Sequence, residues 1–228
     1  MKAPIALALD APSLDVMSKW VADASPHVDV MKVGLETFLR DGFSATSVVR
    51  EHGSRLFLDL KLHDIPNTVA GACRSIAAAA PDFLTVHAAG GPAMIAAAAE
   101  TLPDTAITAV TILTSMSAQD VAAVGYRGTP LETVVLMAEM AVAAGARAIV
   151  CSPQEVSAVR AVVPADITLI TPGVRPAGSA AGDQVRVATP TQAFADGADI
   201  VVIGRPITAA ADISRAAAEI AAEVLNAR

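Results

Sequence analysis

Short apolar segments recur eight times along this chain, and they alternate with Ala-rich stretches of helical period. The apolar segments are rich in Val, Ile, Leu and Ala, and they lie at Ile5–Asp10, Val28–Val33, Leu56–Leu60, Phe83–His87, Ile107–Leu113, Ala148–Cys151, Ile167–Thr171 and Ile200–Gly204. The helical stretches include Leu14–Ala24, Thr68–Ala80, Met94–Thr101, Leu131–Ala144 and Pro190–Ala195. Continuous apolar strands that alternate with helices indicate a parallel sheet covered by helices. Eight such units in 228 residues predict an α/β fold, the (β/α)8 TIM barrel, as a single domain over residues 1–228.

A doubly wound open sheet is the alternative arrangement of these elements. A dinucleotide-binding sheet of that kind carries a G-x-G-x-x-G motif after its first strand, and none follows Ile5–Asp10. No linker divides the chain. Its longest irregular segment, Arg175–Gln184, contains two glycines and a serine, so we expect a mobile lid there.

Composition and charge restrict the partners. Apolar residues make up 54% of the chain and charged residues 17%, which indicates a folded protein rather than a disordered one. The net charge of −7 gives no electrostatic reason to bind nucleic acid or anionic lipid, so we expect a small-molecule partner. The first apolar run stops at Asp10 and no run of about 18 apolar residues follows, so we expect no membrane segment and a cytoplasmic location.

The carboxyl ends of the strands are where a parallel barrel places its active site. In this chain nearly every such end carries a polar residue or a glycine: Asp10, Lys32, Asp59, Lys61, His87, Thr114, Pro172 with Gly173, and Gly204 with Arg205. We therefore expect these residues to meet at one mouth of the barrel.

The third strand carries the most informative of these ends. Side chains alternate between the two faces of a strand, so Phe57, Asp59 and Lys61 share the inner face and the intervening leucines face the helices. Asp64 follows three residues later, and Lys32 is expected on the neighbouring strand. Two carboxylates and two ammonium groups can then alternate in space beside a substrate. The alternative interpretation is an ion-pair network with a purely structural role.

A second group of residues follows strands seven and eight, where barrels commonly bind phosphate. Thr171–Arg175 contains Pro172, Gly173 and an arginine, and Gly204 is followed by Arg205. Glycine lets backbone N–H groups approach phosphate oxygens, and a guanidinium group can donate two parallel hydrogen bonds to them. Gly204-Arg205-Pro206 could otherwise be only a turn into the last helix.

A metal site is the competing prediction for the third strand end, because His63 and Asp64 are possible ligands. Lys32 stands where such a site would need another ligand, so we expect no metal. Cys73 and Cys151 have neither a disulfide-framework nor a metal-binding spacing. We interpret His87 as a histidine that supports its neighbours rather than one that reacts.

The segment Asp59-Leu60-Lys61-Leu62-His63-Asp64-Ile65-Pro66-Asn67-Thr68 resembles the signature of the orotidine 5′-phosphate decarboxylase family, whose core is an Asp-x-Lys-x-x-Asp pattern. The resemblance covers nearly the whole chain. It includes Leu-Ala-Leu-Asp at 7–10, Lys-Val-Gly at 32–34, Leu-Thr-Ser-Met at 113–116, Thr-Pro-Gly-Val-Arg-Pro at 171–176, Gly-Asp-Gln at 182–184 and Ile-Gly-Arg-Pro at 203–206.

The resemblance implies decarboxylation of orotidine 5′-monophosphate to uridine 5′-monophosphate, the last step of pyrimidine nucleotide synthesis, without a cofactor. It implies that Asp59 sits against the departing carboxylate and that Lys61 stabilises the C6 carbanion and then protonates it. Lys32 and Asp64 would complete the charged array.

The resemblance also implies the substrate contacts and a homodimer. Asp10 would hold a ribose hydroxyl, and Thr114 would meet the pyrimidine. Asp64 and Thr68 would reach into the neighbouring subunit's site. The residues implied at the phosphate end are Pro172, Arg175, Gln184, Gly204 and Arg205.

Two alternatives to this activity remain open at this point. One is a metal-dependent sugar-phosphate decarboxylase or aldolase of the same barrel group, which shares the Asp-x-Lys-x-x-Asp pattern. The other is a barrel that binds a nucleotide without turning it over.

Overall fold

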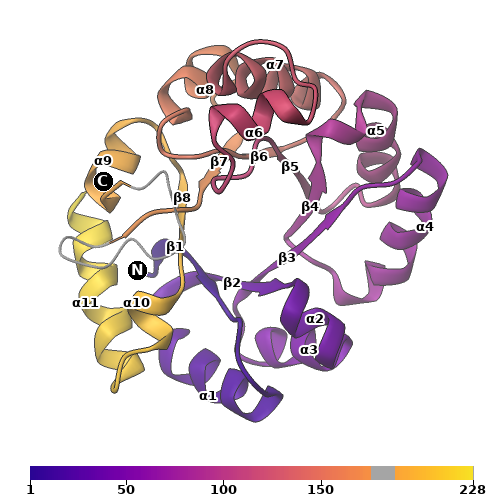
Figure 1. Cartoon of the computed structure of the whole chain (residues 1–228). Helices are drawn as coiled ribbons and strands as arrows, with labels where there is room; N and C mark the ends of the chain where they lie inside the picture. The colour runs from indigo at the N-terminus through magenta and orange to yellow at the C-terminus, as the bar shows by residue number, and fades with distance from the viewer. Residues whose placement is uncertain (176–187, 228) are drawn as a thin grey trace.

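Eight parallel strands form a closed barrel in the computed structural model, which describes residues 1–175 and 188–227 (Figure 1). Each strand pairs with its neighbours in chain order, and β8 pairs with β1. The strands are β1 Ala3–Ala8, β2 Val28–Gly34, β3 Arg55–Leu62, β4 Phe83–His87, β5 Ala106–Val110, β6 Ala148–Val150, β7 Thr168–Thr171 and β8 Ile200–Ile203. The predicted (β/α)8 barrel is confirmed, and the open sheet is excluded.

Helices surround the strands on the outside of the barrel (Figure 1). They are α1 Leu14–Ala24, α2 Leu35–Asp41, α3 Phe43–Glu51, α4 Pro66–Ile76, α5 Pro92–Thr101, α6 Ala118–Ala123, α7 Pro130–Ala143, α8 Val156–Val162, α9 Pro190–Ala195, α10 Arg205–Thr208 and α11 Ile213–Asn226. Local chemistry sets where several of them begin. The Thr129 side chain and Glu132 form a capping box at the start of α7, and prolines occupy the first turn of α4, α5, α7 and α9. Within the described ranges, no helix is long and apolar enough to cross a membrane.

Four strands end earlier than the apolar pattern of the sequence predicts: β6 and β8 by one residue, and β1 and β5 by more. β1 ends at Ala8 rather than Asp10, and β5 ends at Val110 rather than Leu113. The difference has a physical cause, because Leu9 and Ile112 are buried in the loops that follow these strands. The apolar run therefore extends beyond the last residue of the strand, and Asp10 lies in a loop.

The core has two layers that the alternation of strand side chains creates. Inside the barrel, Phe57 of β3 packs edge-to-face against Phe83 of β4, with ring centroids 5.8 Å apart. Outside it, Leu56 and Leu58 of β3 are fully buried against the helices. The predicted division of this strand into an inner and an outer face is thus confirmed. On the inner face, Asp59 follows Phe57 toward the carboxyl end of the strand.

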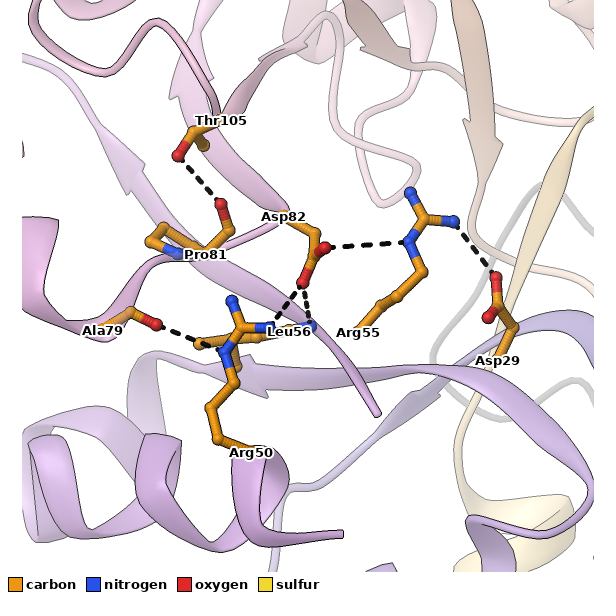
Figure 2. A network of polar contacts seen from close by, with 8 residues as sticks. All are labelled: Asp29, Arg50, Arg55, Leu56, Ala79, Pro81, Asp82 and Thr105. Carbon is orange, nitrogen blue, oxygen red and sulfur yellow. Dashed lines mark hydrogen bonds and ion pairs between the residues drawn. The ribbon is translucent and has the colours of Figure 1, made fainter. Parts of the chain in front are cut away.

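A polar network lies at the opposite end of the barrel, where β3 and β4 begin (Figure 2). The Asp82 carboxylate accepts a hydrogen bond from the Leu56 N–H at 2.7 Å and pairs with Arg50 Nη1 at 3.1 Å. Arg55 bridges Asp82 and Asp29, with its Nη1 3.1 Å from Asp29, and its guanidinium group lies 4.7 Å from the Phe83 ring centroid. These contacts tie α3 and the starts of β2, β3 and β4 together.

We expect Asp82→Ala to lower the free energy of unfolding by about 1–3 kcal/mol, because it leaves the buried Leu56 N–H without its acceptor. Asp104→Ala is the matched control, since Asp104 is an exposed aspartate in a turn. Urea denaturation of both variants measures the difference. Equal midpoints for Asp82→Ala and Asp104→Ala would show that the network contributes nothing to stability.

Candidate active site

One cavity of about 560 Å³ opens at the carboxyl ends of the strands. This volume is in the range of pockets that bind small molecules, about 300–1,000 Å³. Nearly all the site residues predicted from strand ends line it: Asp10, Lys32, Asp59, Lys61, Thr114, Pro172, Gly173, Arg175, Gly204 and Arg205. Residues from opposite ends of the sequence therefore meet in a single space.

Asp59 lies between two lysines at the base of the cavity. Its Oδ1 is 2.8 Å from Lys61 Nζ, and its Oδ2 is 3.2 Å from Lys32 Nζ. The two carboxylate oxygens thus face different ammonium groups, one on its own strand and one on β2. The Asp59 side chain is only 12% exposed and that of Lys32 11%, so water screens this pairing weakly.

The pKa of Asp59 follows from that geometry. Burial alone would raise the pKa of this carboxyl group, and the attraction of Lys32 and Lys61 outweighs it, so the pKa lies below its ordinary value. Asp59 is therefore an anion at neutral pH. The cavity holds a fixed negative charge between two cationic side chains, and either cation can face a substrate.

Asp10 reaches the same cavity from the loop after β1. The Thr37 hydroxyl of α2 donates a 2.6 Å hydrogen bond to the Leu9 carbonyl, which anchors this loop next to Asp10. Gly34, at the end of β2, leaves the space that Asp10 and Lys32 occupy: a Cβ there would lie 3.0 Å from Asp10 Oδ1 and 3.2 Å from Lys32 Nζ. Gly34 belongs to the Lys-Val-Gly motif, but the motif alone does not predict this spatial role.

The loops after β7 and β8 carry the residues predicted to bind phosphate. Gly173 has a φ of 78°, a left-handed conformation that favours glycine, and this turn follows β7 directly. Arg175 and Arg205 line the cavity with Gly173 and Gly204. The structure thus brings together the loops after β7 and β8. Gln184, and the predicted lid beyond Arg175, lie outside the described residues.

Asp64 and Thr68 do not line this cavity. Both are exposed, and Asp64 Oδ1 accepts a 2.6 Å hydrogen bond from the Ile65 N–H in the loop before α4. Ile65, next to Asp64, is also exposed, at 65%. Within one chain, therefore, only three of the four predicted charged groups lie together in the cavity: Lys32, Asp59 and Lys61.

His87 and His63 form a pair beside the charged array, with ring centroids 5.3 Å apart. Burial, together with repulsion from His63 and Lys61, holds the pKa of His87 below its ordinary value. His87 is therefore neutral at pH 7. It does not line the cavity. Among residues 1–175 and 188–227, no three His, Cys, Asp or Glu side chains are grouped so that they could hold a metal ion.

Comparison with known proteins identifies the family of this chain. The model of the Orotidine 5'-phosphate decarboxylase / HUMPS family matches residues 3–220. The chain belongs to this family. It is 60% identical to the orotidine 5′-phosphate decarboxylase of Thermobifida fusca over 227 residues, covering 98% of this chain and 97% of the relative. It is 49% identical to that of Frankia casuarinae, covering 97% and 87%.

A solved structure of the family has the same fold. The crystal structure of orotidine 5′-phosphate decarboxylase from Lactobacillus acidophilus superposes with a TM-score of 0.84 at 34% sequence identity, covering 98% of this chain and 99% of that one. The family resemblance stated from the sequence motifs is confirmed.

Proposed function

We propose that this chain converts orotidine 5′-monophosphate to uridine 5′-monophosphate and CO2 without a cofactor, as its relatives' names imply. The observation that carries the proposal is the Lys32–Asp59–Lys61 array, which lies in the same cavity as the glycine and arginine loops after β7 and β8. One end of the cavity suits a reacting carboxylate, and the other suits a phosphate.

Lys61 carries the chemical step in this proposal. When the bond between C6 and the carboxylate breaks, its electron pair stays on C6 as a poorly delocalised anion. The Lys61 ammonium, already held 2.8 Å from Asp59 Oδ1, supplies fixed positive charge to that anion. A proton then moves from Lys61 Nζ to C6, and the neutral amine regains a proton from solvent after CO2 leaves.

Asp59 and Lys32 prepare the array for that step. The low pKa of Asp59 keeps it ionised, so it holds both ammonium groups in place before substrate arrives. Asp59 sits against the departing carboxylate in this arrangement, where its charge favours loss of CO2. Preorganised charges cost no reorganisation at the moment of reaction.

The remaining residues bind the parts of the substrate that do not react. Arg175 and Arg205, with the backbone of Pro172, Gly173 and Gly204, suit the phosphate, and Gln184 is proposed to join them. Asp10 would accept a hydrogen bond from a ribose hydroxyl, and Thr114 would contact the pyrimidine. Binding energy from the phosphate can then close Arg175–Gln184 over the site and exclude water.

We propose further that the active unit is a homodimer in which Asp64 and Thr68 complete the partner's site. Their exposure and their absence from the cavity of their own chain support this. Ile65, which is exposed beside them, would be covered in the same interface. In the cell such a dimer would perform the last step of pyrimidine nucleotide synthesis, in the cytoplasm.

The test of the proposed reaction is whether the purified chain turns over orotidine 5′-monophosphate in excess EDTA. Activity that needs added Mg²⁺ would favour a metal-dependent sugar-phosphate enzyme of the same barrel group. Binding of the nucleotide without turnover would favour a non-catalytic barrel.

A further inference from the structure

Thr85 lies directly beneath the charged array, in the middle of β4. It is fully buried and does not line the cavity. Its hydroxyl donates a hydrogen bond to Asp59 Oδ1 at 3.0 Å and accepts one from the Lys61 backbone N–H at 2.8 Å. One hydroxyl group thus joins the side chain of Asp59 to the main chain of Lys61.

The pairing of β3 with β4 is irregular at this point. Leu58 pairs with Leu84 and Leu62 pairs with Val86, so three residues of β3, at 59–61, face the single residue Thr85. The extra residues break the regular ladder. Within that break Lys61 has a φ of 50°, in the left-handed region that a side chain of this length rarely adopts. The Thr85 hydroxyl serves as the acceptor for the Lys61 N–H there.

The chemistry of the two hydrogen bonds fixes their directions. An ionised carboxylate can only accept, so the single hydroxyl hydrogen of Thr85 points to Asp59. A lone pair of the same oxygen is then left for the Lys61 N–H. Asp59 Oδ1 also receives Lys61 Nζ at 2.8 Å, so Thr85 touches both ends of the Lys61 residue, one of them through Asp59.

We propose that Thr85 is a positioning residue for the reaction: its hydroxyl holds Lys61 in the left-handed conformation and holds Asp59 against the Lys61 ammonium. The inference rests on the proposed function, since it concerns the position of the Lys61 ammonium, the group proposed to protonate C6. Because Thr85 touches neither the cavity nor any residue at its phosphate end, it acts on the chemical step rather than on substrate binding.

The decisive variant is Thr85→Val, which keeps the shape of the side chain and removes the hydroxyl. We expect kcat for orotidine 5′-monophosphate to fall by about 10–100-fold, the scale of a catalytic group displaced by about 1 Å. KM should stay within about twofold of the parent value, because the substitution leaves the residues that bind the substrate in its ground state unchanged. Thr85→Ser, which restores the hydroxyl, should recover kcat to within about threefold of the parent.

Thr108→Val is the matched control. Thr108 is the register partner of Thr85 on β5, is equally buried, and donates its hydroxyl to the Ala106 carbonyl of its own strand at 2.9 Å. It should keep the parent kcat. The positioning role would be overturned if Thr85→Val kept the kcat of the parent, or if Thr108→Val lost as much kcat as Thr85→Val. If Thr85→Val does not fold, Thr85→Ala takes its place with the same expectations.

A second readout does not depend on turnover. The Lys61 amide should exchange its hydrogen with solvent faster in Thr85→Val than in the parent, Thr85→Ser and Thr108→Val, as measured by NMR. Unchanged exchange would contradict the hydrogen bond on which the inference rests. A parent without decarboxylase activity would instead refute the proposed function, so the two failures are distinguishable.

Discussion

Lys61→Ala is expected to lower turnover of orotidine 5′-monophosphate by at least several orders of magnitude. In the proposed mechanism this substitution removes both the fixed charge beside C6 and the proton donor. Loss of a preorganised electrostatic group costs about 10²–10³ in kcat, and loss of a general acid costs a further 10²–10⁴ or so. Steady-state kinetics should show this loss in kcat, and Lys19→Ala, which removes an exposed lysine of α1, is the control.

Asp59→Ala should have an effect of similar size, because it leaves Lys32 and Lys61 without the anion that orders them. In the proposed mechanism the three charges work as a unit, so the double variant Asp59→Ala/Lys61→Ala should be about as inactive as either single variant. Turnover within about tenfold of the parent in either single variant is incompatible with the roles given to these residues.

Recovery of activity in a mixture of two inactive variants is the second large effect expected. Lys61→Ala and Asp64→Ala should each be nearly inactive alone. If the chain forms the proposed dimer, half the dimers are mixed after random subunit exchange, and each mixed dimer has one site with Lys61 from one chain and Asp64 from the other. Activity should therefore return to about a quarter of the parent value per site, from the symmetry of a two-fold dimer.

The control mixture is Lys61→Ala with Asp59→Ala. These two residues lie 2.8 Å apart in one chain, so exchange leaves every site with one of them missing and no activity should return. If the Lys61→Ala and Asp64→Ala mixture also stays inactive after exchange has been verified, Asp64 does not act in the partner's site.

The barrel can be predicted from sequence because its signal is local and repeated. The alternation of side chains along β3 predicts Phe57 inside the barrel and Leu56 against the helices, and both lie there. The paired helices α2 and α3 were not predicted, because each is a short segment, 7 and 9 residues, interrupted at Gly42. Gly42 has a φ of 55°, a turn that the helical period does not reveal.

The parts of the site that escaped prediction depend on pairing between strands. Thr85 sits inside an apolar strand, where a threonine is an ordinary β-former, and only the register of β3 against β4 shows what its hydroxyl touches. The left-handed conformation of Lys61 has the same origin. Asp64 and Thr68 are a different case: the sequence motif names both, but neither lines the cavity of its own chain, and their place in a partner's site stays a prediction from the family resemblance.

The most direct test of the account is decarboxylation of orotidine 5′-monophosphate, labelled in its carboxyl group, by the purified chain in excess EDTA. The released CO2 is trapped and counted, and the uridine 5′-monophosphate formed is measured in the same sample. The Lys32–Asp59–Lys61 array predicts equal amounts of the two products, at a rate that EDTA and added Mg²⁺ leave unchanged. No labelled CO2, or release only when Mg²⁺ is restored, would contradict it.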